Sequence, residues 1–301
     1  KTGPAIGSIL MGIASSIPLL VIVFTLIIEK RGDLILTNII SANIANLTLV
    51  LGTLSFLKPL NREYNFQKGI LGFIILLMSV FSLFIFVNID FNTTKDFSVN
   101  INRSTGYVLI GLFFLFILFF NFFKNNHGHH LISKNLKKEL FFVFLFGLLV
   151  AWFANSTVKA FILIAQNYSI PAIIIGSVIG VIGASLPELA IGLVCLIKKD
   201  HESVFSNLIT SCIVNFNLGL GLAIIILGTI IVDNVNIFFK IPFMLFVLFV
   251  ATIFFMKKNV KKNDLESSFA KQIEDLGITR FEGFILLFLF CSWILSLLFL
   301  L

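Results

Sequence analysis

The sequence predicts an all-α integral membrane protein of about nine transmembrane helices, arranged as two inverted repeats. Composition is the first reason. The 301 residues are 58% hydrophobic and 12% charged, and the mean hydropathy is +1.06, as in proteins that cross a bilayer several times. A second reason is that one proline-interrupted apolar pattern occurs twice, once in each half of the chain. A third is that lysine and arginine gather in alternate loops between the apolar stretches.

The most informative stretch is Gly183-Ala-Ser-Leu-Pro-Glu188, inside an apolar segment over residues 171–197 that is long enough to cross a bilayer as a helix. Pro187 leaves the carbonyl of Gly183 without its helical donor, and a membrane tolerates this only beside protein or a water-filled cavity. A carboxylate at bilayer depth usually marks an ion pathway. The Gly183 carbonyl, the Ser185 hydroxyl and the Glu188 carboxylate are therefore candidate oxygen ligands for a cation. The alternative is a simple proline kink with a protonated or paired Glu188.

The earlier copy of this pattern is Ala14-Ser-Ser-Ile-Pro-Leu19, in which Leu19 stands where the later copy has Glu188. We call the separation between matching positions, such as Pro18 and Pro187, the repeat offset. In both copies a short charged loop and a second apolar segment follow, and asparagines match at the repeat offset: Asn38 with Asn207, and Asn46 with Asn215. Two such units separated by an odd number of spans face opposite ways, which is the inverted-repeat plan of secondary transporters.

These motifs resemble the two alpha repeats of the calcium/cation antiporter superfamily, which includes the sodium/calcium exchangers. Members carry G-[TS]-S-x-P-E followed by G-N-x-x-G-S-N-I-x-N. The second repeat matches through GASLPE and Asn207-Leu-Ile-Thr-Ser-Cys-Ile-Val-Asn215. The first repeat, with Asn38-Ile-Ile-Ser-Ala-Asn-Ile-Ala-Asn46, is degenerate because its glutamate is Leu19. The family plan is five plus five helices, and because the chain starts at Lys1 we expect the first of them to be missing.

The resemblance implies a cation site shared between the repeats. Ser211 and Asn215 lie four residues apart, so they share one helix face, and the resemblance implies that this face meets Glu188 and Ser185. The first repeat would supply the opposing half, with Ala42 at the position that matches Ser211. The expected cation ligands are Glu188, Ser185, Gly183, Asn215, Ser211, Asn46, Ser15, Ser16 and Ala14. No cofactor is expected, since the ions are cargo.

Nine spans are predicted, over residues 3–28, 34–57, 69–87, 106–123, 140–166, 171–197, 204–231, 237–256 and 281–301. They divide into a first repeat over 1–123, a linker over 124–139 and a second repeat over 140–301. Loops on one side hold sixteen lysines and arginines, and those on the other hold five: Lys30, Arg31, Lys95, Arg103 and Lys240. The positive-inside rule places the richer side, with the linker, in the cytoplasm of a plasma (inner) membrane protein.

The resemblance implies a secondary antiporter that exchanges sodium for calcium or another cation by alternating access. Leu19 leaves one carboxylate for a divalent ion, although desolvation costs several kcal/mol per ion. Two alternatives follow, namely a relative that moves only monovalent cations or protons, and a non-transporting membrane protein. An enzyme is disfavoured because no nucleophile–base pair, phosphate loop or zinc pattern occurs. The net charge of +7 reflects loop orientation, so we expect the lipid bilayer and inorganic cations as partners and no nucleic acid.

Two further features have alternative interpretations. Lys159 lies inside the fifth predicted span, where it either extends to the membrane interface or forms an ion pair with Glu188 that a cation displaces. The linker contains His127-Gly-His-His130, which is either a solvated stretch or a metal site. The solvated stretch is favoured because no carboxylate or cysteine lies close by in the sequence.

Overall fold

The computed structural model describes residues 4–61, 66–85, 87–90, 98–122, 149, 152–153, 156, 159–161, 163–164, 166–170, 172–232, 239–256 and 276–298. The predicted linker over 124–139, with its histidines, lies outside these residues, as does most of the predicted span over 140–166.

Long helices overlap the predicted apolar spans in the described part of the chain. The first half contains α1 (Pro4–Ile28), α2 (Gly32–Ala45), the π-helix η1 (Asn46–Val50), α3 (Leu51–Leu57), β1 (Leu60–Asn61), α4 (Phe66–Ile85), β2 (Val87–Asp90), β3 (Ser98–Asn102) and α5 (Arg103–Phe122). The second half contains α7 (Ala172–Ile197), α8 (His201–Ile213), the π-helix η2 (Val214–Leu220), α9 (Gly221–Leu227), β4 (Thr229–Val232), α10 (Ile241–Met256), β5 (Leu276–Ile278) and α12 (Arg280–Leu298).

The length and surface of these helices suit a bilayer. In the described part of the chain, four helical segments are long and apolar enough to cross one: Met11–Ile28, Gly32–Leu57, Ser203–Leu227 and Arg280–Leu297. The helix exteriors expose large apolar side chains, among them Phe24, Phe81, Phe114, Phe249 and Phe288. Such a surface would be unfavourable in water and is favourable against lipid tails.

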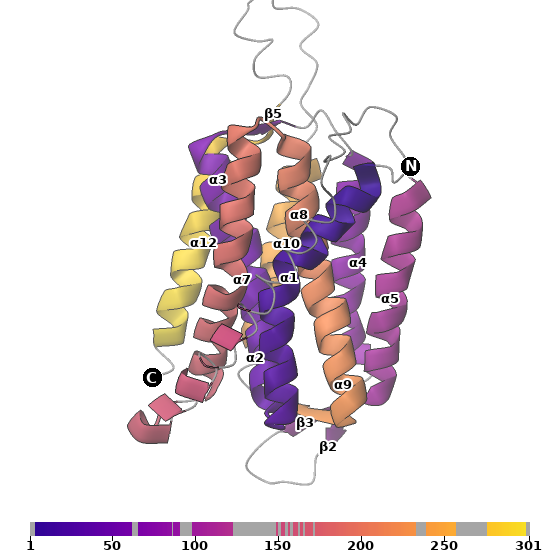
Figure 1. Cartoon of the computed structure of the whole chain (residues 1–301), viewed down its shortest axis with the longest axis vertical. Coiled ribbons are helices and arrows are strands. Elements are labelled where there is room, and N and C mark those ends of the chain that lie inside the picture. The colour runs from indigo at the N-terminus through magenta and orange to yellow at the C-terminus, as the bar shows by residue number, and fades with distance from the viewer. Residues whose placement is uncertain are drawn as a thin grey trace, which may run out of the picture.

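Short strands at both ends of the bundle depart from the all-α expectation. Strand β1 pairs with β5, and β2, β3 and β4 form a second antiparallel sheet in the order β2-β3-β4. Figure 1 shows β5 at the top of the bundle and β2 and β3 at the bottom. We call these the β5 end and the β4 end. Because β1 and β5 are two or three residues long and pair across distant segments, sequence periodicity carries no signal for them.

The turn between the first two helices has the same conformation in both halves. Lys30 and Lys199, which match at the repeat offset, have φ values of 55° and 60°. The amide of Arg31 donates to the carbonyl of Leu26 at 2.9 Å, and that of Asp200 donates to Cys195 at 2.9 Å. These bonds close the ends of α1 and α7 in the manner of a Schellman motif.

The helix after this turn is interrupted by a π-helical segment in both halves. Helix α2 continues through η1 into α3, and α8 continues through η2 into α9. Asn46 lies in η1, and Asn215, its match at the repeat offset, lies in η2. A π-helical turn widens the backbone and is frequent at functional sites. Both asparagines predicted as cation ligands therefore lie on irregular helical turns inside the bundle.

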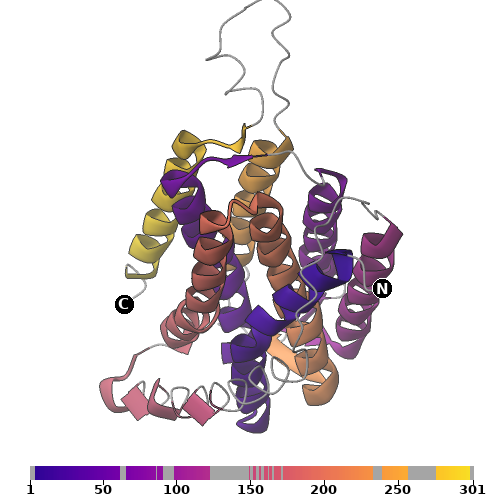
Figure 2. The same ribbon diagram turned by 45° about the horizontal axis from the view of Figure 1, so that its top comes forward.

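Helices from the two halves interlock in matching pairs. Helix α1 packs against α8, and α2 packs against α7. Helix α12 lies along α3 and α5 lies along α9, as Figure 2 shows. Near the middle, the Nδ2 atom of Asn43 donates to the carbonyl of Cys212 at 3.3 Å, and these two residues also match at the repeat offset.

Glycines allow two of these crossings. A Cβ atom on Gly52 would lie 3.0 Å from the carbonyl oxygen of Gly283, and one on Gly221 would lie 3.2 Å from that of Gly106. Small residues let helix backbones approach closely, and packing of this kind drives helix association in a bilayer. In both the α3–α12 and the α5–α9 contact, the two helix backbones therefore approach each other closely at a pair of glycines.

Gly283→Ala is expected to lower the melting temperature in detergent by roughly 3–10 °C, since overpacking costs about 1–3 kcal/mol. The new Cβ atom would lie 2.7 Å from both the Phe56 amide nitrogen and the Ser55 Oγ atom. Gly111→Ala is the matched control, because a Cβ there meets nothing within 4 Å. The control should keep or slightly raise the melting temperature, because alanine has the higher helix propensity. Equal melting temperatures for the two variants would contradict the close crossing.

Candidate cation site

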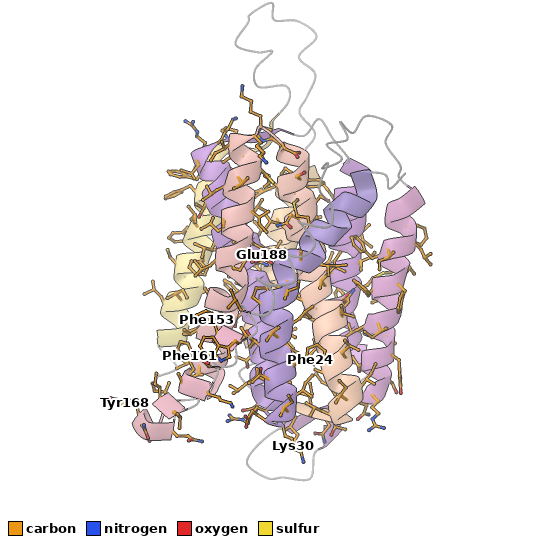
Figure 3. The ribbon with its side chains drawn as sticks, viewed as in Figure 1. Phe24, Lys30, Phe153, Phe161, Tyr168 and Glu188 are labelled. Atoms are coloured by element: carbon orange, nitrogen blue, oxygen red, sulfur yellow. The ribbon has the colours of Figure 1, made fainter. Side chains whose placement is uncertain are left out.

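Glu188 lies in the interior of the bundle, one residue after Pro187 in α7. Its side chain is 0% exposed. Figure 3 shows it about halfway along the bundle, away from Lys30 and Tyr168 at the β4 end. Helix α7 packs here against α1, α2 and α8. The carboxylate therefore faces protein and is kept away from lipid.

A chain of hydroxyl groups connects α1 and α8 to this carboxylate. The Ser211 hydroxyl donates a hydrogen bond to Oε1 of Glu188. The Ser16 hydroxyl lies 3.0 Å from the Ser211 hydroxyl and donates to it or to the Gly12 carbonyl, which is 2.9 Å away. The Ser15 hydroxyl lies 3.0 Å from the Gly12 carbonyl and 3.3 Å from Oδ1 of Asn207, and it donates to one of them. The structure thus brings together Ser16, Ser211 and Glu188, which the sequence analysis predicts to share a site. Ser15 is next to Ser16 in the sequence.

Several buried oxygen atoms around this chain have no hydrogen-bond partner in the described part of the protein. They are Oε2 of Glu188, Oγ of Ser185, and the Oδ1 atoms of Asn46 and Asn215. An unsatisfied buried polar group costs about 1–3 kcal/mol. A cation ligated by several of these oxygens would offset that cost, and carboxylate, amide and hydroxyl oxygens are ligands that hard cations prefer.

Packing places the segments that carry the two asparagines against the helices that carry the carboxylate and the serines. Segment η1, with Asn46, packs against α7 and α8, and η2, with Asn215, packs against α1, α2 and α8. The side chain of Cys212 is fully buried and lies close enough to both Glu188 and Asn46 to interact with them. The site is therefore built from two proline-containing helices, α1 and α7, and from the two π-helical turns that pack against these helices and α8.

Ala14 and Gly183, the two predicted ligands without a polar side chain, are placed differently from the serines and asparagines. Ala14 is exposed and does not join the buried cluster, while Gly183 lies within α7, one turn before Pro187. The carbonyl that meets the serines is instead that of Gly12, 3.0 Å from the Ser15 hydroxyl and 2.9 Å from that of Ser16.

Sequence reasoning missed Gly12, and its close contact with α8 explains why a glycine stands there. A Cβ atom at Gly12 would lie 2.5 Å from the Cβ of Thr210. The available signal was a glycine three and four residues before a pair of serines, because hydroxyls in helices commonly bond the carbonyl at that distance.

The site has fewer polar side chains on the side of α1 and α2 than on the side of α7 and α8. Leu19 and Ala42 are both fully buried, and at the repeat offset they match Glu188 and Ser211. Ser185 corresponds in the same way to Ser16. Ser16 bonds the Ser211 hydroxyl, whereas the hydroxyl of Ser185 has no partner among the described residues because alanine occupies position 42. Among the described residues, Glu188 is therefore the carboxylate of this cluster.

Lys159 does not pair with Glu188. Its side chain is exposed, whereas that of Glu188 is fully buried, and no ion pair joins the two. Of the two interpretations of Lys159, the structure is consistent with a side chain that extends outward.

Ser211→Ala is expected to weaken the apparent sodium affinity of transport roughly tenfold or more. It removes a hydrogen bond to a buried carboxylate, and such bonds contribute about 1.5–3 kcal/mol. The measurement is the sodium dependence of ion flux into proteoliposomes. The control is Ser79→Ala, which removes a buried hydroxyl that donates to a carbonyl of its own helix, Ile75 at 2.7 Å. The same sodium dependence in both variants would contradict a role for Ser211.

Comparison with protein families settles the class of this chain. The model of the family described as sodium/calcium exchanger protein matches residues 2–122 and 138–299. The chain belongs to the sodium/calcium exchanger family. This confirms the resemblance seen in the two repeats, and it confirms that the chain is a member of a transporter family and not of an enzyme family.

Relatives of this sodium/calcium exchanger family member share modest identity with it. CaxA of Alkalimonas amylolytica, named as an antiporter, is 27% identical over 242 residues, covering 76% of this chain and 70% of CaxA. The sodium/calcium exchanger MaX1 of Methanosarcina acetivorans is 24% identical over 287 residues, covering 83% and 80% of the two chains. The inner membrane protein YrbG of Escherichia coli is 28% identical over 148 residues, which are 49% of this chain and 40% of YrbG.

A solved exchanger has the same fold. The structure of the sodium-calcium exchanger NCX_Mj soaked with 2.5 mM Na+ and 10 mM Sr2+ matches 97% of this chain and 86% of its own, with a TM-score of 0.67 and 22% identity. The protein is therefore an integral membrane protein with an exchanger-like helical architecture.

Proposed function

We propose that this protein is a secondary cation antiporter that couples sodium movement to that of a second cation. The buried carboxylate of the candidate cation site supports this proposal. A fully buried carboxylate is hydrogen-bonded on one oxygen, while its other oxygen and the oxygens of Ser185, Asn46 and Asn215 lack partners among the described residues. A partly satisfied carboxylate inside a membrane protein is costly unless a cation or a proton neutralises it.

We further propose that residues 1–123 and 140–301 are inverted repeats related by a pseudo-twofold axis near Asn43 and Cys212. Residues at equivalent positions touch each other only beside such an axis, and the Asn43–Cys212 bond is a contact of this kind. The repeated turns, π-helices and glycine crossings support the same relation. Rocking of one repeat against the other would expose Glu188 to each end in turn.

The ion ligands in this proposal are Glu188, Ser185, Ser211, Asn215, Asn46, Ser15 and Ser16. Gly183 remains a candidate through its carbonyl, whereas Ala14 is not included because it is exposed. The ions are cargo, and the described residues contain no cluster of three or more histidine, cysteine or acidic side chains.

A second candidate function is exchange restricted to monovalent cations or protons. The replacement of the first-repeat acid by the buried Leu19 favours it. One carboxylate neutralises a sodium ion or a proton fully, whereas calcium keeps about one net positive charge in a medium of low dielectric constant. Calcium also prefers six to eight oxygens, and leucine supplies none.

We propose a plasma (inner) membrane location with the β5 end in the cytoplasm. The basic residues predicted to be cytoplasmic include Lys198 and Lys199, which lie in the loop between α7 and α8. The β4 end would then face outward. The description of the relative YrbG as an inner membrane protein supports the location.

Ion flux into proteoliposomes tests the function. An imposed sodium gradient is expected to drive uptake of the second cation, with calcium, potassium and proton gradients varied separately. Sodium-driven calcium uptake supports sodium/calcium exchange, and sodium-driven proton or potassium movement without calcium supports the second candidate. Absence of gradient-driven movement of any of these ions would overturn the proposal in favour of a non-transporting protein.

A further inference from the structure

A buried lysine lies in the bundle, away from Glu188. The side chain of Lys240 is 0% exposed, and its Nζ atom donates a hydrogen bond to the hydroxyl of Ser177, which is also fully buried. Sequence reasoning counted Lys240 among the loop lysines, whereas the structure buries its side chain. A buried lysine in a membrane protein is costly, and lysine near a helix end normally extends to the interface. Its burial therefore requires a specific reason.

The Lys240–Ser177 pair lies at the β4 end of the bundle. Lys240 lies in a π-helical turn directly before α10, which follows β4 in the chain, and so at the β4 end of the bundle. Ser177 lies in the first half of α7, eleven residues before Glu188, or about 16 Å along the helix at 1.5 Å per residue. The pair thus joins α10 to the helix that carries the carboxylate.

The first half of α7 is followed by Pro187. Pro187 removes one hydrogen bond from the helix, so the residues before it are less firmly connected to those after it. On the side of α2, Gly176 packs so closely that a Cβ there would lie 2.8 Å from Cγ2 of Thr37. On another side, Lys240 holds Ser177. The segment from Ala172 to Leu186 is therefore held by close van der Waals packing against Thr37 and by a hydrogen bond from Lys240.

We propose that the Lys240–Ser177 bond is a gate at the β4 end, which holds the first half of α7 closed and separates when the site opens toward that end. The inference rests on the proposed alternating access. An ammonium–hydroxyl bond suits this purpose because water can replace it when the segment opens, whereas apolar packing gains nothing from water. The first half of the chain has Leu71 at the position that matches Lys240 at the repeat offset, so the device is particular to one end.

The native Cys212 provides the test, because it is fully buried and lies close to Glu188. In a Cys195→Ala, Cys291→Ala background, a membrane-impermeant methanethiosulfonate reagent is applied to the β4 side or to the β5 side of oriented vesicles. Lys240→Met and Ser177→Ala are each expected to raise the labelling rate of Cys212 from the β4 side at least fivefold. The rate from the β5 side should stay within twofold, and Lys240→Arg, which keeps a charged donor, should resemble the parent protein.

The alternative outcomes are distinct. Equal labelling in variant and parent from the β4 side, including no labelling in either, would overturn the gate. An equal rise from both sides would also overturn it, because that result indicates general loosening. Ser177→Ala removes only one oxygen atom, so it tests the bond even if Lys240→Met folds poorly. If the proteoliposomes show no ion exchange while the one-sided labelling appears, the proposed function fails and the gate stands.

Discussion

Glu188→Gln is expected to reduce gradient-driven cation exchange at least a hundredfold. Glutamine keeps the size of the side chain and can still accept the hydrogen bond from Ser211, so the packing of α7 against α8 is preserved. What is lost is the single negative charge of the cluster. Removing one partner of a buried charge pair costs about 3–5 kcal/mol, which is roughly two or more orders of magnitude in affinity. Ion flux into proteoliposomes at several sodium concentrations is the measurement.

Glu282→Gln is the matched control, since Glu282 is also a buried glutamate on a helix. Its carboxylate accepts a hydrogen bond from the Thr279 amide at 2.8 Å, while the Thr279 hydroxyl accepts one from the Glu282 amide at 3.3 Å. This is a capping box at the start of α12, and glutamine serves in such a box as well as glutamate does. The control should keep most of the flux. If Glu188→Gln retained as much flux as the control, the candidate site would lose its central ligand.

Leu19→Glu combined with Ala42→Ser is expected to raise calcium transport at least tenfold. The two changes place a carboxylate and a hydroxyl at the positions equivalent to Glu188 and Ser211. Both native residues are fully buried, so the new acid would be unfavourable in the absence of an ion. A divalent cation that bridges the two carboxylates would neutralise them and supply the missing coordination. The variant should therefore melt at a lower temperature without calcium and be stabilised by calcium, which thermal unfolding in detergent measures.

Ile22→Glu combined with Ala42→Ser is the control for burying an acid on α1. Ile22 is buried one turn beyond Leu19, in the same apolar cluster. This control should melt lower with and without calcium. An absence of calcium-dependent stabilisation and transport in the Leu19→Glu variant would mean that the first repeat no longer forms half of a divalent site. The monovalent function would then be the better description.

Much of the architecture follows from local sequence. Apolar stretches of sufficient length become helices in a bilayer because every backbone group must be hydrogen-bonded within the segment. The predicted spans therefore overlap the observed helices in the described part of the chain. The motif around Pro187 and the four-residue spacing of Ser211 and Asn215 likewise indicate which side chains share a helix face. These are properties of one helix at a time.

The sequence by itself thus determined the class of protein, the repeated pattern and most of the buried oxygen atoms around Glu188. Only the tertiary structure decided that the Gly12 carbonyl contacts the hydroxyls of Ser15 and Ser16, that Gly52 meets Gly283, and that Lys240 is buried against Ser177. The physical reason is that the glycine crossings and the lysine contact join helices far apart in the chain. Which carbonyl or ammonium meets a partner depends on how two helix surfaces cross, and hydropathy and periodicity contain no information about that crossing.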